Sequence, residues 1–358
     1  MRPGQKPPDG RHDDGVERAW DHGPARVPLG TWPTPLERAP RLGAHLGLGP
    51  DDLWVKRDDL TGLGGGGNKV RKLEYLCGSA REHAATVLVT SGAAQSNHAR
   101  LTAAAACRVG LRCCLVLAGA PPATPTGNIA LDGLLGADIV WTGSTDDVEL
   151  VERTTEIADE LRAAGEVVEL IPYGGSSVRG ACGYVDCGRE LLAQLPGARH
   201  IVVAVGSGGT LAGLVACLGP ERVLGVDAGA VPDPVARVAA LVQGIRSLTA
   251  APGVAPATLR VRADQVGPGY GLLTPAARDA LVAAARCEGL VLDPVYTAKA
   301  LSGLAAAIGD GEITPGEQVV FVHTGGLPGL FGHDVLDDPG AFGTHPGREA
   351  GRGSPGPP

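Results

Sequence analysis

The sequence predicts an α/β fold whose strands are mostly parallel and are covered by helices on both faces. Short, continuous apolar runs alternate along most of the chain with segments of helical periodicity. The runs do not alternate apolar with polar residues, which indicates strands that are buried on both faces. Strands separated by helices favour parallel pairing, because each helix returns the chain to the start of the next strand.

The individual elements follow from these patterns. Strands are predicted within residues 85–90, 111–119, 137–143, 167–175, 200–209, 222–229 and 317–326. Helices are predicted at residues 97–109, 148–164, 179–195, 209–218, 275–288 and 297–308. Both ends of one helix are marked, because Thr274 is a capping residue, Pro275 suits the first helical position and Gly289 suits the end.

Composition narrows the class of protein. A length of 358 residues suits one or two domains of ordinary size. The net charge is -8 and no run is rich in Lys or Arg, which disfavours nucleic acid. No apolar stretch approaches the roughly 20 residues of a membrane span, and Met1–Asp14 lacks the apolar core of a signal peptide. We therefore expect a cytoplasmic protein with a small-molecule partner.

The cysteines give no sign of a metal site. None of the 8 cysteines belongs to a CxxC pair or a Cys/His ligand set. Cys113 and Cys114 are adjacent within a strand-like run, so we expect their side chains to face opposite sides of a sheet. A redox-active vicinal pair is the alternative.

Residues 54–76 combine a glycine-rich turn with two lysines. A predicted strand leads through an acidic turn to Gly64–Gly67, and Lys69 follows at the start of a helix. A helix N-terminus disfavours a positive charge, so the pKa of Lys69 should be lowered, which suits imine formation with an aldehyde. Lys72 lies one turn further on the same face and could meet a phosphate. An ordinary loop with two solvated lysines is the alternative.

Residues 89–106 place polar side chains where a strand leads into an Ala-rich helix. Free backbone N–H groups at such a helix start can hold a carboxylate. Ser96 offers a hydroxyl for proton transfer, and Asn97 can donate to a phenolate oxygen. Simple helix capping by either residue is the alternative, and we expect His98 to be structural.

Two further segments favour an anion and a flat ring. Residues 206–210 form a Gly-Ser-Gly-Gly-Thr turn between a buried strand and a helix, which suits a phosphate. Its glycine spacing departs from GxGxxG, so dinucleotide binding is the weaker interpretation. Tyr270 and Tyr296 fall in loops rich in Gly and Pro, where a tyrosine can cover a ring or move a proton, or can simply pack a turn.

Six motifs taken together resemble one known family. GGGNKVRKLEYL, QSNHAR, GSGGTLAGL, GPGYGL, DPVYTAKA and HTGGLPGLF occur in order between about Gly30 and Phe331. They resemble the pyridoxal-phosphate (PLP) enzymes of fold type II that include D-cysteine desulfhydrase and 1-aminocyclopropane-1-carboxylate (ACC) deaminase. The resemblance implies a two-domain, tryptophan synthase β-like fold, PLP as cofactor, a small amino-acid substrate and a homodimer.

The resemblance also implies domain limits. A large PLP-binding domain would comprise residues 27–72 and 177–337, and a small domain residues 73–176. The polar, Pro-rich ends, residues 1–26 and 338–358, are expected to be disordered.

The resemblance assigns a role to individual residues. Lys69 would bind the cofactor covalently and act as acid and base, Ser96 would be the second catalytic group, and Tyr270 and Tyr296 would flank the substrate. The remaining residues implied to bind the cofactor are Lys72, Asn97, Gly206, Ser207, Gly208, Gly209, Thr210, Thr297 and Thr324. Among them Lys72 and residues 206–210 would hold the phosphate, Asn97 the phenolic oxygen, and Thr297 would lie near the pyridine nitrogen.

Two positions favour one activity within the family. ACC deaminases carry Glu and Leu where this chain has Thr297 and Thr324. Neutral Thr297 cannot hold a protonated ring nitrogen as a carboxylate would, so the ring would be a weaker electron sink. The sequence therefore predicts α,β-elimination, with D-cysteine giving pyruvate, sulfide and ammonia. Cysteate sulfo-lyase, ACC deaminase, dehydratase, racemase, β-replacement enzyme or a non-catalytic binding protein are the alternatives.

Overall fold

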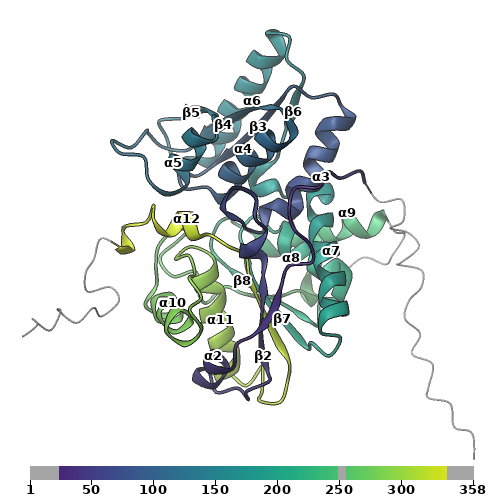
Figure 1. Ribbon diagram of the computed structural model, residues 1–358, viewed down its shortest axis with the longest axis vertical. Helices are drawn as coiled ribbons and strands as arrows, with labels where there is room; N and C mark the ends of the chain where they lie inside the picture. The colour runs from purple at the N-terminus through teal and green to yellow at the C-terminus, as the bar shows by residue number, and fades with distance from the viewer. Residues whose placement is uncertain (1–23, 249–254, 337–358) are drawn as a thin grey trace, which may run out of the picture.

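The computed structural model describes residues 24–248 and 255–336, which form two α/β lobes, one above the other in Figure 1. The lower lobe contains a six-stranded sheet and the upper lobe a four-stranded sheet. This confirms the predicted α/β class with parallel sheets between helices. The domain limits given above remain a prediction. Apart from residues 24–26, the predicted disordered ends lie outside the described residues.

The larger sheet has the strand order β1-β2-β10-β7-β8-β9. Its strands are β1 (Leu36–Arg38), β2 (Leu53–Arg57), β7 (His200–Val205), β8 (Val223–Asp227), β9 (Arg260–Arg262) and β10 (Val319–His323). All pairs are parallel except β1 with β2, and β1 is an edge strand. The central strands β7, β8 and β10 are buried along their whole length, which is why each is a continuous apolar run.

Helices cover both faces of this sheet. α2 (Pro40–His45), α10 (Pro275–Glu288) and α11 (Thr297–Gly309) share one apolar core with it. α7 (Val178–Gln194), α8 (Gly209–Leu218) and α9 (Pro234–Ser247) share the core on the opposite face. The predicted ends of α10 are confirmed, because the Thr274 hydroxyl caps the first turn and Gly289 takes the left-handed conformation.

The smaller sheet is entirely parallel, with the order β5-β4-β3-β6. Its elements are α3 (Lys69–Glu82), β3 (Val87–Gly92), α4 (Asn97–Val109), β4 (Arg112–Leu117), α5 (Gly127–Leu134), β5 (Asp138–Trp141), α6 (Asp147–Ala163) and β6 (Val168–Leu170). α3 and α4 pack on one face and α6 on the other. The Cys113 side chain packs in the apolar core that contains α3 and α4, and the Cys114 side chain packs in the core that contains α6. The prediction that the two side chains face opposite sides of the sheet is therefore confirmed.

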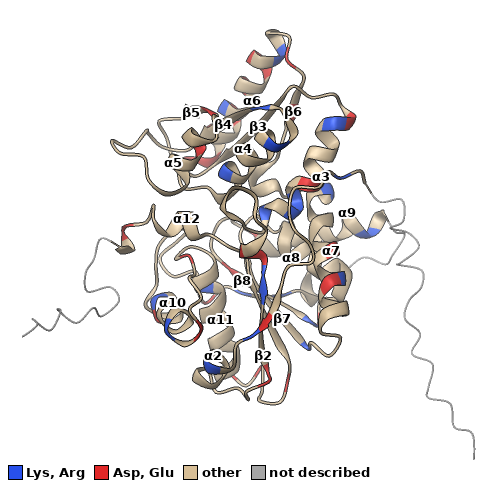
Figure 2. Cartoon of the chain, viewed as in Figure 1, with Lys and Arg blue, Asp and Glu red and all other residues tan. Residues whose placement is uncertain are grey.

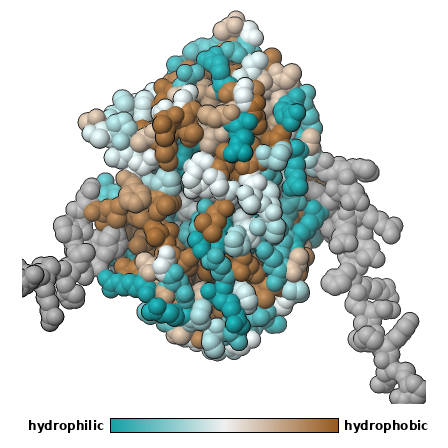
Figure 3. Space-filling view, in the orientation of Figure 1, coloured by the Kyte–Doolittle hydropathy of each residue, from teal (hydrophilic) through white to brown (hydrophobic). Residues whose placement is uncertain are grey.

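Apolar side chains gather on the surface over α12 (Leu327–Leu330), as Figure 3 shows. Exposed members of this patch are Leu327, Phe331 and Leu336. A contiguous apolar surface of this kind is a candidate contact surface. No helix within the described ranges has the length and apolarity needed to cross a membrane.

Candidate active site

The candidate site lies where the carboxyl ends of the parallel strands of both sheets meet. In α/β proteins ligands bind beyond these strand ends. A cavity is found there, as expected for a small-molecule site in this position. It is lined by Asn68, Lys69, Lys72, Ser96, Asn97, His98, Tyr173, Gly174, Ala204, Gly206, Ser207, Gly208, Thr210, Asp293, Tyr296, Thr324 and Gly325. Motifs far apart in the sequence therefore share one cavity.

Lys69 and Lys72 lie side by side at the start of α3, where Lys72 is buried and Lys69 is partly buried. Burial lowers the pKa of Lys69 to about 8, so its amine is partly neutral near physiological pH. The pKa of Lys72 is lowered further, first by burial and then by neighbouring Lys69. Within the described chain, no carboxylate is among the groups that shift either pKa. Two amines without a carboxylate partner thus favour the binding of an anion in the cavity.

A phosphate cradle lies next to Lys72. The Lys72 Nζ donates to Gly174 O at 3.2 Å and to Ser176 Oγ at 2.9 Å, both neutral acceptors. Ser176 Oγ lies 2.7 Å from Ser207 Oγ and accepts from the Gly209 N–H at 3.1 Å. The helix α8 begins here with Gly208 as its N-cap and no N-cap side chain, so N–H groups of its first turn other than that of Gly209 are available to bind an anion.

The glycines of this turn are required by close approach. A Cβ added to Gly209 would lie 2.9 Å from Lys72 Nζ and 2.7 Å from Ser176 Oγ. Gly208 takes a φ of +89°, a conformation that favours glycine. Buried amines without a carboxylate, uncapped N–H groups and hydroxyls together fit a phosphate ester. An aldehyde on the same molecule would find Lys69 beside it.

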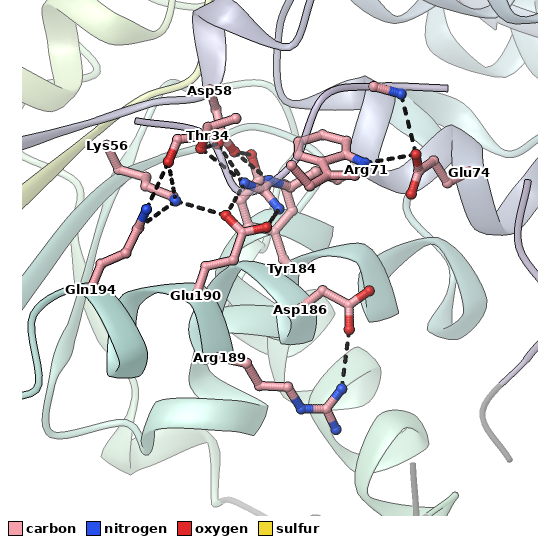
Figure 4. A network of polar contacts seen from close by, with 12 residues as sticks. Thr34, Lys56, Asp58, Arg71, Glu74, Tyr184, Asp186, Arg189, Glu190 and Gln194 are labelled. Atoms are coloured by element: carbon pink, nitrogen blue, oxygen red, sulfur yellow. Dashed lines mark hydrogen bonds and ion pairs between the residues drawn. The ribbon is translucent and has the colours of Figure 1, made fainter. Parts of the chain in front are cut away.

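The opposite side of α3 is held by a buried polar network (Figure 4). Arg71 forms paired hydrogen bonds with Asp58 and with Glu190, each at 2.8 Å. Tyr184 donates to Asp58 at 2.6 Å, and Lys56 contacts Glu190 at 2.7 Å. Figure 2 shows residues of both charge signs near the centre of the molecule, between the two lobes. The network joins α3 to α7 and to the turn after β2, which fixes the start of the helix that carries Lys69.

The structure determines which way the Asn97 amide faces. Its Oδ1 accepts from Asn128 Nδ2 at 3.1 Å and from Arg100 Nη2 at 3.4 Å. Its Nδ2 is therefore the atom available to donate into the cavity. Arg100 is buried and also donates to the carbonyls of Gly64 and Gly66, so it joins the glycine-rich turn to Asn97.

The helix start beside Asn97 agrees with the capping interpretation. Ser96 is the N-cap of α4, and its hydroxyl accepts from the Ala99 N–H at 3.1 Å while lining the cavity. His98 contacts Thr90 through Nε2 at 3.0 Å, and its buried Nδ1 has no hydrogen-bond partner among the described residues. Burial lowers the pKa of His98 well below its usual value, so the ring is neutral.

Tyr296 lines the cavity, and Tyr270 stands behind it with their hydroxyl oxygens 2.5 Å apart. Asp293 also lines the cavity, and its carboxylate accepts from the N–H groups of residues 295–297 and from the Thr297 hydroxyl. Thr297 is fully buried against Asp293 and does not line the cavity, whereas Thr324 does. The contact of Thr297 with a cofactor therefore remains a prediction that the side chain's present hydrogen bonds do not favour.

Several residues of the site and its support were not predicted from the sequence, among them Tyr173, Ser176, Asp293 and Arg100. Tyr173 and Ser176 lie after β6 in a Gly-Gly-Ser-Ser turn, a pattern similar to residues 206–210 that could have drawn attention to it. Asp293 stands within the DPVYTAKA motif itself. No group that could hold a metal ion is found in residues 24–248 and 255–336.

Comparison with known proteins identifies the family. Residues 27–325 match the family described as "Pyridoxal-phosphate dependent enzyme". The chain is 40% identical over 324 residues to a Pyrococcus abyssi protein named "Putative 1-aminocyclopropane-1-carboxylate deaminase", covering 87% of this chain and 95% of that protein. It is 39% identical over 314 residues to a D-cysteine desulfhydrase of Klebsiella pneumoniae, covering 84% and 94% of the two chains.

A solved structure agrees with these relatives. The crystal structure of an ACC deaminase homologue, 36% identical, superposes with a TM-score of 0.82 and covers 90% of this chain and 97% of that one. Threonine deaminase isoform 2 of Solanum lycopersicum, 21% identical with a TM-score of 0.59, shares the fold and covers 89% and 86% of the two chains. The chain therefore belongs to the pyridoxal-phosphate-dependent enzymes of fold type II, and its cofactor is pyridoxal 5'-phosphate.

Proposed function

We propose that this protein is a PLP-dependent lyase that catalyses α,β-elimination on a small β-substituted amino acid, with D-cysteine as the substrate. D-Cysteine and water would give pyruvate, sulfide and ammonia. The similarity to both a D-cysteine desulfhydrase and a protein named as an ACC deaminase supports a lyase of this group. The homodimer and the cytoplasmic location expected from the sequence remain predictions.

Each part of the cavity has a task in this reaction. Bound PLP supplies an aldehyde that couples to amino groups and a ring that delocalises negative charge formed at Cα. The Lys69 Nζ, with a pKa of about 8, would hold the cofactor and then take the proton from Cα. The Lys72 amine and the α8 N-terminus would hold the phosphate. The Asn97 Nδ2 would donate to the ring hydroxyl, and N–H groups at the start of α4 would hold the substrate carboxylate.

One observation favours elimination of a good leaving group. Asp293 is the single carboxylate among the described residues that line the cavity. Both of its oxygens already accept hydrogen bonds from the first turn of α11 and from Thr297. No other carboxylate is available in that lining to hold a protonated ring nitrogen, so the electron sink would be weak. A thiol leaves readily from a β carbon, whereas an unactivated cyclopropane ring opens with difficulty.

Pyruvate and sulfide release from D-cysteine by the PLP-loaded protein tests this proposal. We expect equal amounts of both products, a much slower rate with L-cysteine, and little 2-oxobutyrate from ACC. The second candidate is ACC deaminase, which the names of two relatives favour. Faster turnover of ACC than of D-cysteine would replace the proposal with this candidate. No product from either compound, despite bound cofactor, would overturn both.

A further inference from the structure

Tyr173 occupies a wall of the cavity that the family motifs do not account for. It is the first residue of the turn Tyr173–Gly175, directly after β6 of the smaller sheet. It lines the same cavity as Tyr296, which comes from the larger lobe. The turn comes close to the reactive lysine, since a Cβ added to Gly174 would lie 3.8 Å from Lys69 Nζ. Tyr173 therefore stands where the smaller lobe faces the reacting atoms.

The two tyrosines of the larger lobe are held in place. Their rings meet edge to face with centroids 6.0 Å apart. The loop that carries Tyr270 is fixed by Lys299, whose buried Nζ donates to Val266 O at 2.8 Å and to Gly269 O at 3.0 Å. On the other side of Tyr270, His333 contacts Gly271 O at 2.9 Å. This pair cannot move aside easily for a larger substrate.

Tyr173 meets this fixed pair from the opposite lobe. The pKa of Tyr173 is raised, first by burial and then by neighbouring Tyr270. The pKa of Tyr270 is raised as well, again chiefly by burial. All three phenols thus stay protonated at neutral pH. Tyr173 of the smaller lobe and Tyr296 of the larger lobe line the same cavity, and Tyr270 stands behind Tyr296.

We propose that Tyr173 is a specificity-determining residue that closes the substrate side of the cavity and limits the amino acid to a β-substituent about the size of a thiol. The inference rests on the proposed function for the position of the substrate, and it defines the substrate class further. In this role the Tyr173 ring takes up space in the cavity that a bulky group beyond the β atom would need. Removal of the ring should open this space, whereas removal of the hydroxyl alone should not.

The test measures binding through the absorbance of the bound cofactor, read by stopped flow immediately after mixing and before turnover consumes the amino acid. Wild type, Tyr173→Ala and Tyr173→Phe are titrated with cysteine, S-methylcysteine and S-benzylcysteine, each as D and L enantiomers. We expect wild type and Tyr173→Phe to prefer cysteine over S-benzylcysteine, and Tyr173→Ala to shift this ratio of dissociation constants at least tenfold toward S-benzylcysteine. Cofactor content and melting temperature establish that each variant is folded and loaded.

Two outcomes would overturn the inference: an unchanged ratio in a loaded Tyr173→Ala variant, or the same shift in Tyr173→Phe. Tyr75→Phe is a matched control, because the Tyr75 hydroxyl contacts Asp186 outside the cavity and its loss should change nothing in the ratio. The proposed function can fail separately. A ring-dependent size limit in a protein that releases no pyruvate from D-cysteine would retain the role of Tyr173 and reject the desulfhydrase reaction.

Discussion

The two sides of helix α3 carry buried cations in opposite situations. On one side Arg71 is paired with Asp58 and Glu190, and Lys56 shares Glu190. On the other side Lys69 and Lys72 face the cavity, and their pKa values are lowered by burial with no carboxylate to offset it. A buried charge is tolerated when it is paired and hydrogen-bonded, and is costly when it is not. The paired side holds the fold together, and the unpaired side is left for an anionic ligand.

The largest effect is expected from Lys69→Ala. Loss of the amine removes both the covalent link to the cofactor and the base for the Cα proton, so turnover should fall by about 10⁴-fold or more. The variant should still bind PLP without a covalent bond, because Lys72 and the α8 N-terminus remain. Steady-state rates and cofactor absorbance measure the two effects. A residual rate above a few per cent of wild type would reject Lys69 as the reactive lysine.

On the paired side, Asp58→Asn should destabilise the protein whether or not PLP is bound. Removing one partner of a buried ion pair costs about 3–5 kcal/mol. Urea unfolding measures the change in free energy of unfolding. The matched control is Asp159→Asn, whose partner Arg162 is on the surface of α6 and whose loss should cost under about 1 kcal/mol. Equal effects of the two substitutions would contradict the structural role of the Arg71 network.

On the unpaired side, Lys72→Met should behave in the opposite way. The apoprotein should keep its free energy of unfolding within about 1 kcal/mol, because the buried amine that is removed has two neutral hydrogen-bond acceptors but no carboxylate partner. PLP affinity should fall roughly 10- to 100-fold through loss of a charge-assisted hydrogen bond to the phosphate. Equilibrium dialysis of PLP measures this, with Arg108→Met at an exposed position of α4 as a control of equal charge change. Unchanged affinity would place the phosphate elsewhere.

A change in pH should have a smaller effect, on the rate at which PLP attaches covalently to the apoenzyme. Burial lowers the pKa of Lys69 from its ordinary value to about 8, so the neutral amine forms as pH rises through 8. The rate at which PLP attaches covalently to the apoenzyme should therefore rise about tenfold from pH 7 to pH 9 and level off above that. Stopped-flow absorbance between pH 6.5 and 9.5 measures it. A midpoint near the ordinary lysine value would show that Lys69 is solvated in the apoenzyme.

The sequence was informative wherever the signal is local. Buried strands such as β7 are continuous apolar runs, and Lys69 and Ser96 stand at helix starts that can be recognised from neighbouring residues. Short elements were not predicted, among them the edge strand β9 of 3 residues and the helix α5 of 8 residues.

Contacts between residues that are far apart in the sequence could not be predicted. Arg71 and Glu190 are separated by 119 positions, and nothing in either segment indicates that they meet. Tyr173 falls in the strand predicted within residues 167–175, whereas β6 ends at Leu170 and Tyr173 begins the turn that follows. Its place in the cavity could not be predicted, because it depends on how the two lobes face each other. The contrast between Arg71 on one side of α3 and Lys69 and Lys72 on the other can be recognised only when the partners of all three side chains are known.

Borohydride reduction of the PLP-loaded protein followed by peptide mass spectrometry tests the central claim most directly. The lysines of the chain are Lys6, Lys56, Lys69, Lys72 and Lys299. Reduction fixes the cofactor on the lysine to which it is bound. The account predicts the added mass on Lys69 alone, with none on the adjacent Lys72 or on paired Lys56. Modification of Lys72 or Lys299, or of no lysine, would contradict it.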